Sequence, residues 1–172
     1  MEKRPGRTAD VTALSLLVRI ERWRGALPLE AVQEVVRAVA VTPLSGRRGS
    51  LLGYVDLRGE LCPVVDARRI FHLRGRALRP SDRMVVLAVG TDRLIVPVDE
   101  VGRVSTVRIA EDVGPEAVAP DPSRELTGLR AARVDEPGGE VLALVDPLAV
   151  FGHFAPARMS ATVTEGGSGP VP

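Results

Sequence analysis

The chain carries an internal repeat, which limits the folds that its 172 residues can adopt. Residues 23–35 match residues 92–104, 69 positions later, because both segments run through an apolar-Pro-apolar-acid sequence into Val-x-x-Val. Residues 59–66 match residues 139–146, 80 positions later, and both copies continue to an apolar-Phe pair. Because the two matches occur in the same order, the chain is predicted to consist of two similar halves.

Short valine-rich and leucine-rich runs fill both halves, and glycine and proline separate them. The chain has 26 Val, a residue that suits strands, and its 17 Gly and 14 Pro lie mostly at turn spacing. Five short antiparallel strands bury little alone, so each half is expected to close into a barrel. We therefore predict an all-β fold of two similar five-stranded, SH3-like β-barrel subdomains, residues 14–73 and 84–152. Short connecting helices are expected at residues 30–33, 67–73 and 147–151, and a strand is expected at residues 34–41.

The two ends of the chain differ from these halves. Residues 1–11 are mostly polar, and residues 155–172 end in a run of Gly, Ser and Pro, so both are predicted to be flexible tails around one domain, residues 12–152. The longest apolar run, residues 84–89, is far shorter than the roughly 20 residues that a membrane span needs. No direct membrane insertion is predicted.

Charge and aromatic content exclude further kinds of partner. With 23 Lys and Arg against 22 Asp and Glu, the formal net charge of +1 gives no attraction to nucleic acid. Aromatic residues make up only 3%, so base-stacking platforms are not expected. The single cysteine, Cys62, cannot form an internal disulfide, which is typical of a reducing cytoplasm.

No group of residues in the sequence has the spacing of a catalytic or metal site. His72 and His153 lack ligand spacing, and Cys62 is interpreted as a small core residue, with a reactive thiol as the alternative. Asp66 and Asp146 occupy matching positions, so they could act as general acid and base. Because each follows a strand and precedes a short helical stretch, a helix-capping role is favoured. We predict no enzyme, no metal and no cofactor.

Two connecting segments carry opposite charge. Residues 74–83 contain four Arg and one Asp, and residues 109–125 contain five acids and one Arg. Both are interpreted as solvated loops. The alternative is that the two segments pair with each other or that each contacts a partner.

One segment of the first half resembles the signature of a known family. Residues 53–68 read Gly-Tyr-Val-Asp-Leu-Arg-Gly-Glu-Leu-Cys-Pro-Val-Val-Asp-Ala-Arg. This sequence is similar to the Gly-x-x-Asn-Leu-Arg-Gly-x-x-x-Pro-Val-x-Asp-Leu-Arg signature of CheW-like domains, the adaptors of bacterial chemosensory arrays. Residues 27–35 and 95–101 also resemble segments of that family, and the resemblance extends over residues 12–152. Asp56 stands where the family has Asn, Ala67 stands where it has Leu, and Gly102-Arg103 stands where an acidic residue is common.

The resemblance implies two five-stranded barrels and a non-catalytic coupling function. The implied partners are the regulatory domain of a CheA-type histidine kinase and the cytoplasmic tip of a methyl-accepting chemoreceptor. The implied location is cytoplasmic, at membrane receptor arrays reached through these partners. The alternative is a CheW-like scaffold in another chemosensory pathway, such as one for gliding motility or development.

The resemblance also implies binding residues at matching positions. The predicted receptor-binding and kinase-binding residues are Val32, Glu34, Val35, Gly53, Arg58, Val101 and Val104. Each has a structural alternative, because the valines alternate with polar residues and can be core, Gly53 can serve backbone geometry, and Arg58 can brace a turn.

Overall fold

The computed structural model of the chain describes residues 11–46, 49–121 and 127–154. The strands in this part are β1 (Thr12–Ile20), β2 (Trp23–Pro28), β3 (Val32–Arg37), β4 (Thr42–Pro43), β5 (Leu51–Leu57), β6 (Glu60–Val65), β7 (Arg83–Val89), β8 (Asp92–Val98), β9 (Glu100–Ile109), β10 (Leu129–Val134) and β11 (Val141–Val145). The helical elements are α1 (Ala67–Ile70), α2 (Pro147–Phe151) and three 3-10 turns, η1 (Leu29–Ala31), η2 (Pro115–Ala117) and η3 (Gly152–Phe154). The expected tails, apart from Val11, lie outside the described residues.

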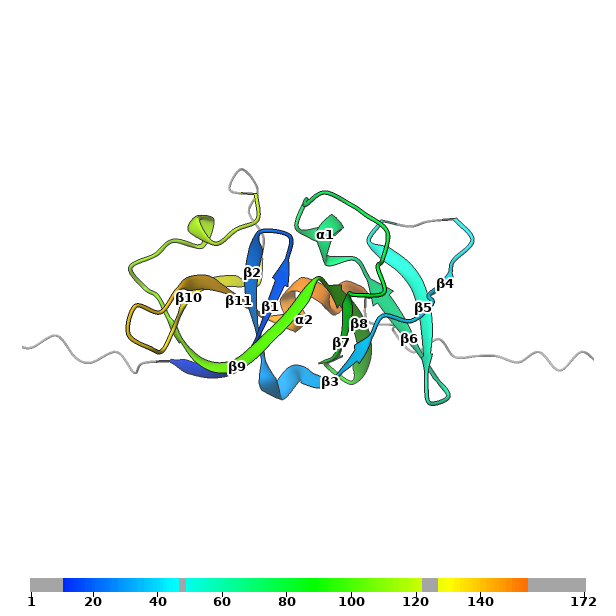
Figure 1. The fold of residues 1–172 in the computed structure, drawn as a ribbon, viewed down its shortest axis with the longest axis horizontal. Helices are drawn as coiled ribbons and strands as arrows, with labels where there is room; N and C mark the ends of the chain where they lie inside the picture. The colour runs from blue at the N-terminus through cyan, green and yellow to red at the C-terminus, as the bar shows by residue number, and fades with distance from the viewer. Residues whose placement is uncertain (1–10, 47–48, 122–126, 155–172) are drawn as a thin grey trace, which may run out of the picture.

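The strands form a closed barrel and a second sheet, which lie side by side with α2 between them (Figure 1). The barrel has the order β1-β2-β11-β10-β9, and the second sheet has the order β3-β7-β8-β6-β5-β4. Pairing is antiparallel except between β2 and β11 and between β6 and β8. The predicted all-β class is confirmed, with one of the two expected barrels closed.

The second sheet nearly repeats the barrel. Its two outer strands, β3 and β4, belong to one stretch of chain that is interrupted at residues 38–41. The equivalent strand of the barrel, β9, is continuous and pairs with both β1 and β10. The expected strand at residues 34–41 therefore begins earlier, at Val32, and ends at Arg37.

The two sheets do not coincide with the two expected halves of the chain, residues 14–73 and 84–152. The first hairpin, β1-β2, joins the barrel with β9, β10 and β11, whereas β7-β8 joins the second sheet with β3 to β6. The connections explain this exchange. Only Asp99 separates β8 from β9, and a hairpin needs about two loop residues, so β9 cannot fold back onto β8 and crosses to the barrel.

Three apolar clusters hold this arrangement together. The largest, here called the central core, contains residues from both sheets and both α-helices, including Leu16, Val85 and Phe151. A second cluster, centred on Met84 and Ile95, fills the second sheet, and a third fills the barrel. Because both sheets contribute residues to the central core, the barrel and the second sheet are expected to unfold as one unit.

Candidate functional site

The valines at matching positions of the repeat lie on the equivalent strands β3 and β9. Val32 and Val101 are partly buried and pack against the central core. Val35 and Val104 are 38% and 45% exposed. The first pair therefore belongs to the margin of the core, and the second pair presents aliphatic surface to solvent.

Strand register places the exposed valines at the edge of the central core. Val35 lies opposite the buried Val85 of β7, and Val104 lies opposite the buried Leu16 of β1. Directly opposite residues of antiparallel strands share one face of the sheet, so both exposed valines border the same cluster. Leu14, two residues before Leu16, is 54% exposed and extends the apolar surface along β1.

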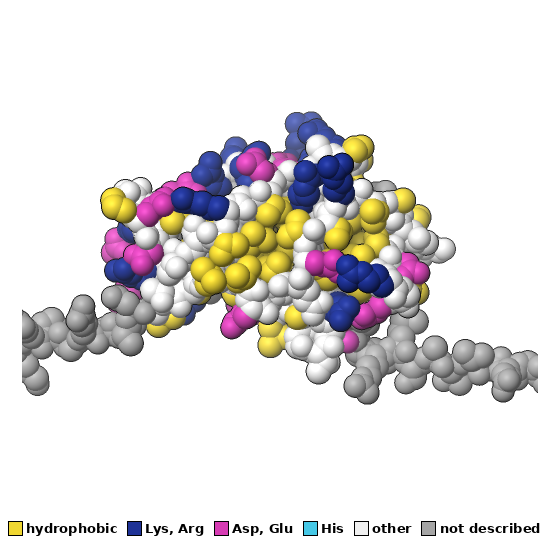
Figure 2. All heavy atoms as spheres, turned by 60° about the horizontal axis from the view of Figure 1, so that its bottom comes forward, with side chains coloured by type: hydrophobic (Ala, Val, Ile, Leu, Met, Phe, Trp, Pro, Cys, Tyr) yellow, Lys and Arg dark blue, Asp and Glu magenta, His cyan; other side chains and the backbone are white. Residues whose placement is uncertain are grey.

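These residues define what we call the junction face, formed by Leu14, Val32, Val35, Val101 and Val104. Strands β3 and β9 lie along the lower edge of the molecule in Figure 1. Figure 2 brings this edge forward and shows an apolar area across its middle, with charged side chains around it. Leu14 was not predicted, because it belongs to an apolar run, residues 14–20, in which the sequence does not distinguish the exposed position from the buried ones.

Glu34, which precedes Val35 on β3, forms an ion pair with Arg58. The Arg58 guanidinium donates to the Glu34 carboxylate at 3.0 Å, and their side chains are 83% and 29% exposed. Arg58 and Gly59 form the two-residue turn between β5 and β6, with φ values of 55° and 87°. Two positive φ values are typical of a type I′ hairpin turn, which holds Arg58 out from the sheet.

The turn is supported by Asp56, whose Oδ1 accepts a hydrogen bond from the Gly59 N–H at 2.6 Å. An Asn carbonyl can accept the same bond, so the departure from the family signature at Asp56 leaves this contact possible. Leu61, which follows the turn on β6, is 69% exposed. Arg103, at another position that departs from the family pattern, pairs with Glu136 at 2.6 Å.

Gly53 occupies a close contact between β4 and β5. Its φ is +151°, and a Cβ placed there would lie 2.1 Å from the Thr42 carbonyl oxygen. Gly53 is buried. Gly53 therefore contributes through its backbone, which lets β4 and β5 approach each other, and not through a side chain.

Asp66 and Asp146 each occupy the N-cap position of a short helix. Asp66 accepts from the Arg68 N–H at 3.0 Å, and Asp146 accepts from the N–H groups of Leu148 and Ala149 at 3.0 and 3.2 Å. Burial raises the pKa of Asp66, and the hydrogen bond from Arg68 opposes that rise. Each carboxylate therefore caps the first turn of its own helix.

The other candidate for chemistry, Cys62, is 1% exposed in the cluster that fills the second sheet. Burial raises the pKa of its thiol. A buried thiol of raised pKa is a poor nucleophile. Among the described residues, no group of three or more His, Cys, Asp and Glu side chains could hold a metal ion.

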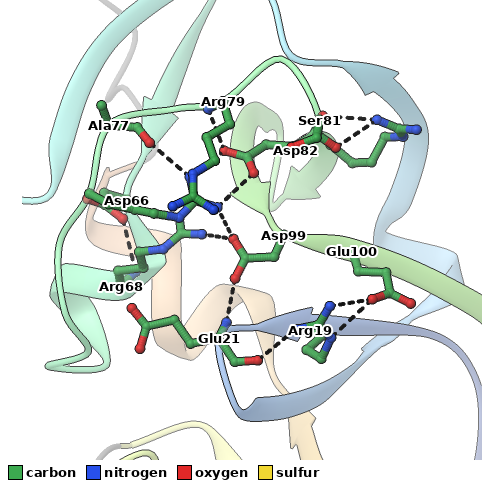
Figure 3. A network of polar contacts seen from close by, with 12 residues as sticks. Arg19, Glu21, Asp66, Arg68, Ala77, Arg79, Ser81, Asp82, Asp99 and Glu100 are labelled. Atoms are coloured by element: carbon green, nitrogen blue, oxygen red, sulfur yellow. Dashed lines mark hydrogen bonds and ion pairs between the residues drawn. The ribbon is translucent and has the colours of Figure 1, made fainter.

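The arginine-rich segment at residues 74–83 is not a solvated loop throughout, which corrects one expectation from the sequence. Arg76 pairs with Asp82 at 2.7 Å and also with Asp99, and Asp82 is only 2% exposed. Arg68, buried in α1, pairs with Asp99 as well (Figure 3). The Glu21 N–H donates to Asp99 at 2.5 Å, so one carboxylate joins α1, this segment and the β1-β2 turn.

Burial alone would raise the pKa of Asp82. Hydrogen bonds from Arg76 and from the Arg79 N–H, with the charges of Arg76 and Arg68, outweigh burial and lower it below its usual value. The Nε of Arg68 is buried without a hydrogen-bond partner among the described residues. The network therefore fixes the segment in place, with one guanidinium nitrogen left unsatisfied.

The acidic segment, residues 109–125, lies partly outside the described residues. In its described part, the Val118 carbonyl accepts a hydrogen bond from the Trp23 indole at 3.0 Å. Asp112 pairs with Arg133 at 3.2 Å. This part of the segment is therefore anchored to the barrel, and its described ion pair is not with residues 74–83.

Comparison with known proteins agrees with these observations. The family model for the CheW-like domain matches residues 15–155. A curated relative, the chemotaxis protein CheW of Treponema pallidum (strain Nichols), is 28% identical over 109 residues, which cover 61% of this chain and 60% of that protein's length. The fold resembles the crystal structure of the scaffolding protein TtCheW from Thermoanaerobacter tengcongensis, with a TM-score of 0.66 and 19% identity over 82% of this chain and 93% of that one.

No helix within the described ranges combines the length and the apolar character needed to cross a bilayer. The family match covers most of the chain and includes both sheets, apart from the first three residues of β1, and every junction-face residue except Leu14. Because the match covers well over half of its length, the chain belongs to the CheW-like domain family.

Proposed function

We propose that this CheW-like domain is a non-catalytic adaptor that couples chemoreceptors to a CheA-type histidine kinase. Its partners in this proposal are the regulatory domain of the kinase and the cytoplasmic tip of a methyl-accepting chemoreceptor. The domain acts in the cytoplasm and reaches the membrane array through these partners. The observation that carries the proposal is the exposed aliphatic surface of the junction face, at matching positions on β3 and β9.

The junction face has the chemistry of a protein-binding surface. Val35, Val104 and Leu14 place aliphatic side chains in solvent, and burying them against an apolar partner is favourable by about 25 cal/mol per Å². The Glu34–Arg58 pair adds a polar margin. An apolar centre with a charged rim is the usual composition of such interfaces.

The predicted binding residues divide into three roles in this proposal. Val35 and Val104 contact the partner, and Val32 and Val101 support them from the core margin. Arg58 makes a polar contact at the rim, and Glu34 orients its guanidinium. Gly53 is a positioning residue, because its backbone brings β4 and β5 together.

The proposal is tested by reconstituting kinase activity from the purified chain, a cognate CheA-type kinase and a receptor cytoplasmic fragment. We expect Val35→Glu and Val104→Glu to weaken receptor-dependent control of autophosphorylation by at least about tenfold. Leu148→Glu is the matched control, because Leu148 is 62% exposed on α2, outside the junction face. Equal activity with and without the wild-type chain would refute coupling. Kinase binding without any response to chemoreceptor fragments would favour the alternative, a scaffold in another chemosensory pathway.

A further inference from the structure

The second sheet has an opening where the barrel has none. The barrel is closed by the continuous strand β9, but the equivalent stretch of the second sheet is interrupted at residues 38–41. A groove of about 810 Å³ lies at this interruption, between residues 38–43 and residues 75–80. The same architecture therefore occurs twice in the chain, once closed by a continuous strand and once with a groove where that strand is interrupted.

The floor of the groove is aliphatic. Val41, Leu52 and Leu78 line it and pack against the buried cluster that fills the second sheet. Val39, at the margin, is 46% exposed. Between described residues, the backbone groups of residues 39–41 make no hydrogen bond, so one wall offers both apolar side chains and free N–H and C=O groups.

The other wall is held in a fixed conformation. Asp82 accepts from the Arg79 N–H at 2.8 Å and from Arg76 at 2.7 and 2.9 Å, and Arg76 also donates to the Ala77 carbonyl at 2.8 Å. The two walls meet where the Ala38 N–H donates to the Asp82 carbonyl at 3.3 Å. A buried carboxylate is costly unless it is paired, and here its pairing holds an irregular surface segment in place. A groove formed in advance lowers the entropy that a ligand must lose on binding.

The charge of the groove selects the ligand. Its carboxylate, Asp66, is 5% exposed and already bonded to the Arg68 N–H. At the rim, Arg69 is partly exposed, pairs with Asp66 at 3.6 Å and donates to the Gly49 carbonyl at 2.6 Å. Arg79 is exposed, and its guanidinium has no ion pair with a described residue. The available charge is therefore positive, and the floor is apolar.

We propose that this groove binds an extended acidic segment of a partner protein, with aliphatic side chains alternating with Asp or Glu. The segment pairs its backbone with residues 39–41, places its aliphatic side chains on the floor and directs its carboxylates to Arg69 and Arg79. Strand addition of this kind gives affinity through the main chain and specificity through alternate side chains. The proposal does not depend on the coupling function, because the groove lies outside the junction face.

The test is a titration of the full-length, ¹⁵N-labelled chain followed by NMR. The probe is an acetylated and amidated hexapeptide of alternating Glu and Val, compared with the same peptide carrying Lys in place of Glu. We expect saturable shifts confined to residues 38–43, 52, 66, 69 and 75–80 with the acidic peptide, and affinity for the basic peptide at least about tenfold lower. Arg79→Glu and Val39→Glu should each lower the affinity of the chain for the acidic peptide by a similar factor. Arg130→Glu, an exposed charge on β10, should leave its affinity unchanged.

Three results would overturn the proposal. The first is the absence of saturable shifts with the acidic peptide, or equal binding of both peptides. The second is concentration-dependent shifts of the groove in the chain alone, which would assign the groove to a second copy. The third is broadening of groove signals by a nitroxide attached at Ser168→Cys, which would assign the groove to the chain's own residues 155–172.

Discussion

Glu34 and Arg58 form a 3.0 Å ion pair that joins β3 to the β5-β6 turn across 24 positions of sequence. The backbone of Arg58 has a positive φ, and its side chain is exposed, whereas Glu34 is half-buried. The pair therefore orders an exposed cation at the β5-β6 turn.

Arg58→Ala should separate binding from stability. Because the Arg58 side chain is 83% exposed, we expect the free energy of unfolding to change by less than about 1 kcal/mol in urea titrations. Kinase coupling in the reconstituted assay should fall clearly. Arg58→Asn is the matched control for the backbone, since Asn tolerates positive φ. A double variant, Glu34→Arg with Arg58→Glu, restores the pair but not the position of the charge. Recovery of coupling in that variant would show that the pair has only a structural role.

Gly53→Ala should destabilise the second sheet. A Cβ at this position would meet the Thr42 carbonyl oxygen at 2.1 Å, so β4 has to move away from β5. We expect a loss of about 2 kcal/mol or more in the free energy of unfolding, measured by urea denaturation. Gly59→Ala is the comparison, because nothing lies within 4 Å of a Cβ there and only its φ of +87° is strained. A larger loss for Gly59→Ala would contradict this account of Gly53.

Asp82→Asn should remove a pH-dependent contribution to stability. The pKa of Asp82 is lowered in the folded chain, so its stabilisation is complete above the unfolded value of about 3.9 and is lost as the pH falls through the folded value. We expect Asp82→Asn to lower the free energy of unfolding by about 3 kcal/mol at pH 7, and this difference should shrink towards zero as the pH falls below about 4. The measurement is the unfolding free energy of both proteins from pH 7 to pH 3.

The control for this pH series is Asp112→Asn, because Asp112 is 73% exposed in its pair with Arg133. That variant should lose less than about 1 kcal/mol at every pH. A difference between wild type and Asp82→Asn that stays constant from pH 7 to pH 3 would show that the Asp82 charge does not contribute.

The Cys62 thiol should be unreactive until the chain unfolds. The side chain is 1% exposed, and burial raises its pKa, so little thiolate is available to a reagent. We expect Ellman's reagent at pH 8 to titrate one thiol per chain in guanidinium chloride and to react slowly with the native chain. Ser45→Cys supplies an exposed thiol in the same chain and should react at once. Rapid reaction of Cys62 in the wild-type chain would indicate local opening of the second sheet.

Local features of the fold could be predicted from the sequence because they depend on neighbouring residues. The β5-β6 turn follows from Arg-Gly between two apolar runs, and the helix at residues 147–151 follows from Asp146 before Pro147. The exchange of hairpins between the two sheets could not be predicted in this way. The repeat shows that the halves are alike, but it contains no information on which half supplies each strand's partner.

The candidate site shows the same division. The family resemblance implied Val35 and Val104 as binding residues, and the structure leaves both partly exposed on the equivalent strands β3 and β9. The Asp82 network was missed because four arginines in ten residues suggest solvent, and its second carboxylate, the partly buried Asp99, lies on a distant connection. The groove was missed because the interruption at residues 38–41 occurs within a run that has strand composition.

The exchanged hairpins determine what happens if the chain is divided. Cleavage between Ala77 and Leu78 would leave the barrel with only β1 and β2 in one fragment, and the second sheet with only β7 and β8 in the other. Neither fragment alone contains every strand of either sheet. Such fragments would regain structure only as a pair, at a rate that rises with the concentration of both, so the chain is naturally suited to serve as a split reporter of molecular proximity.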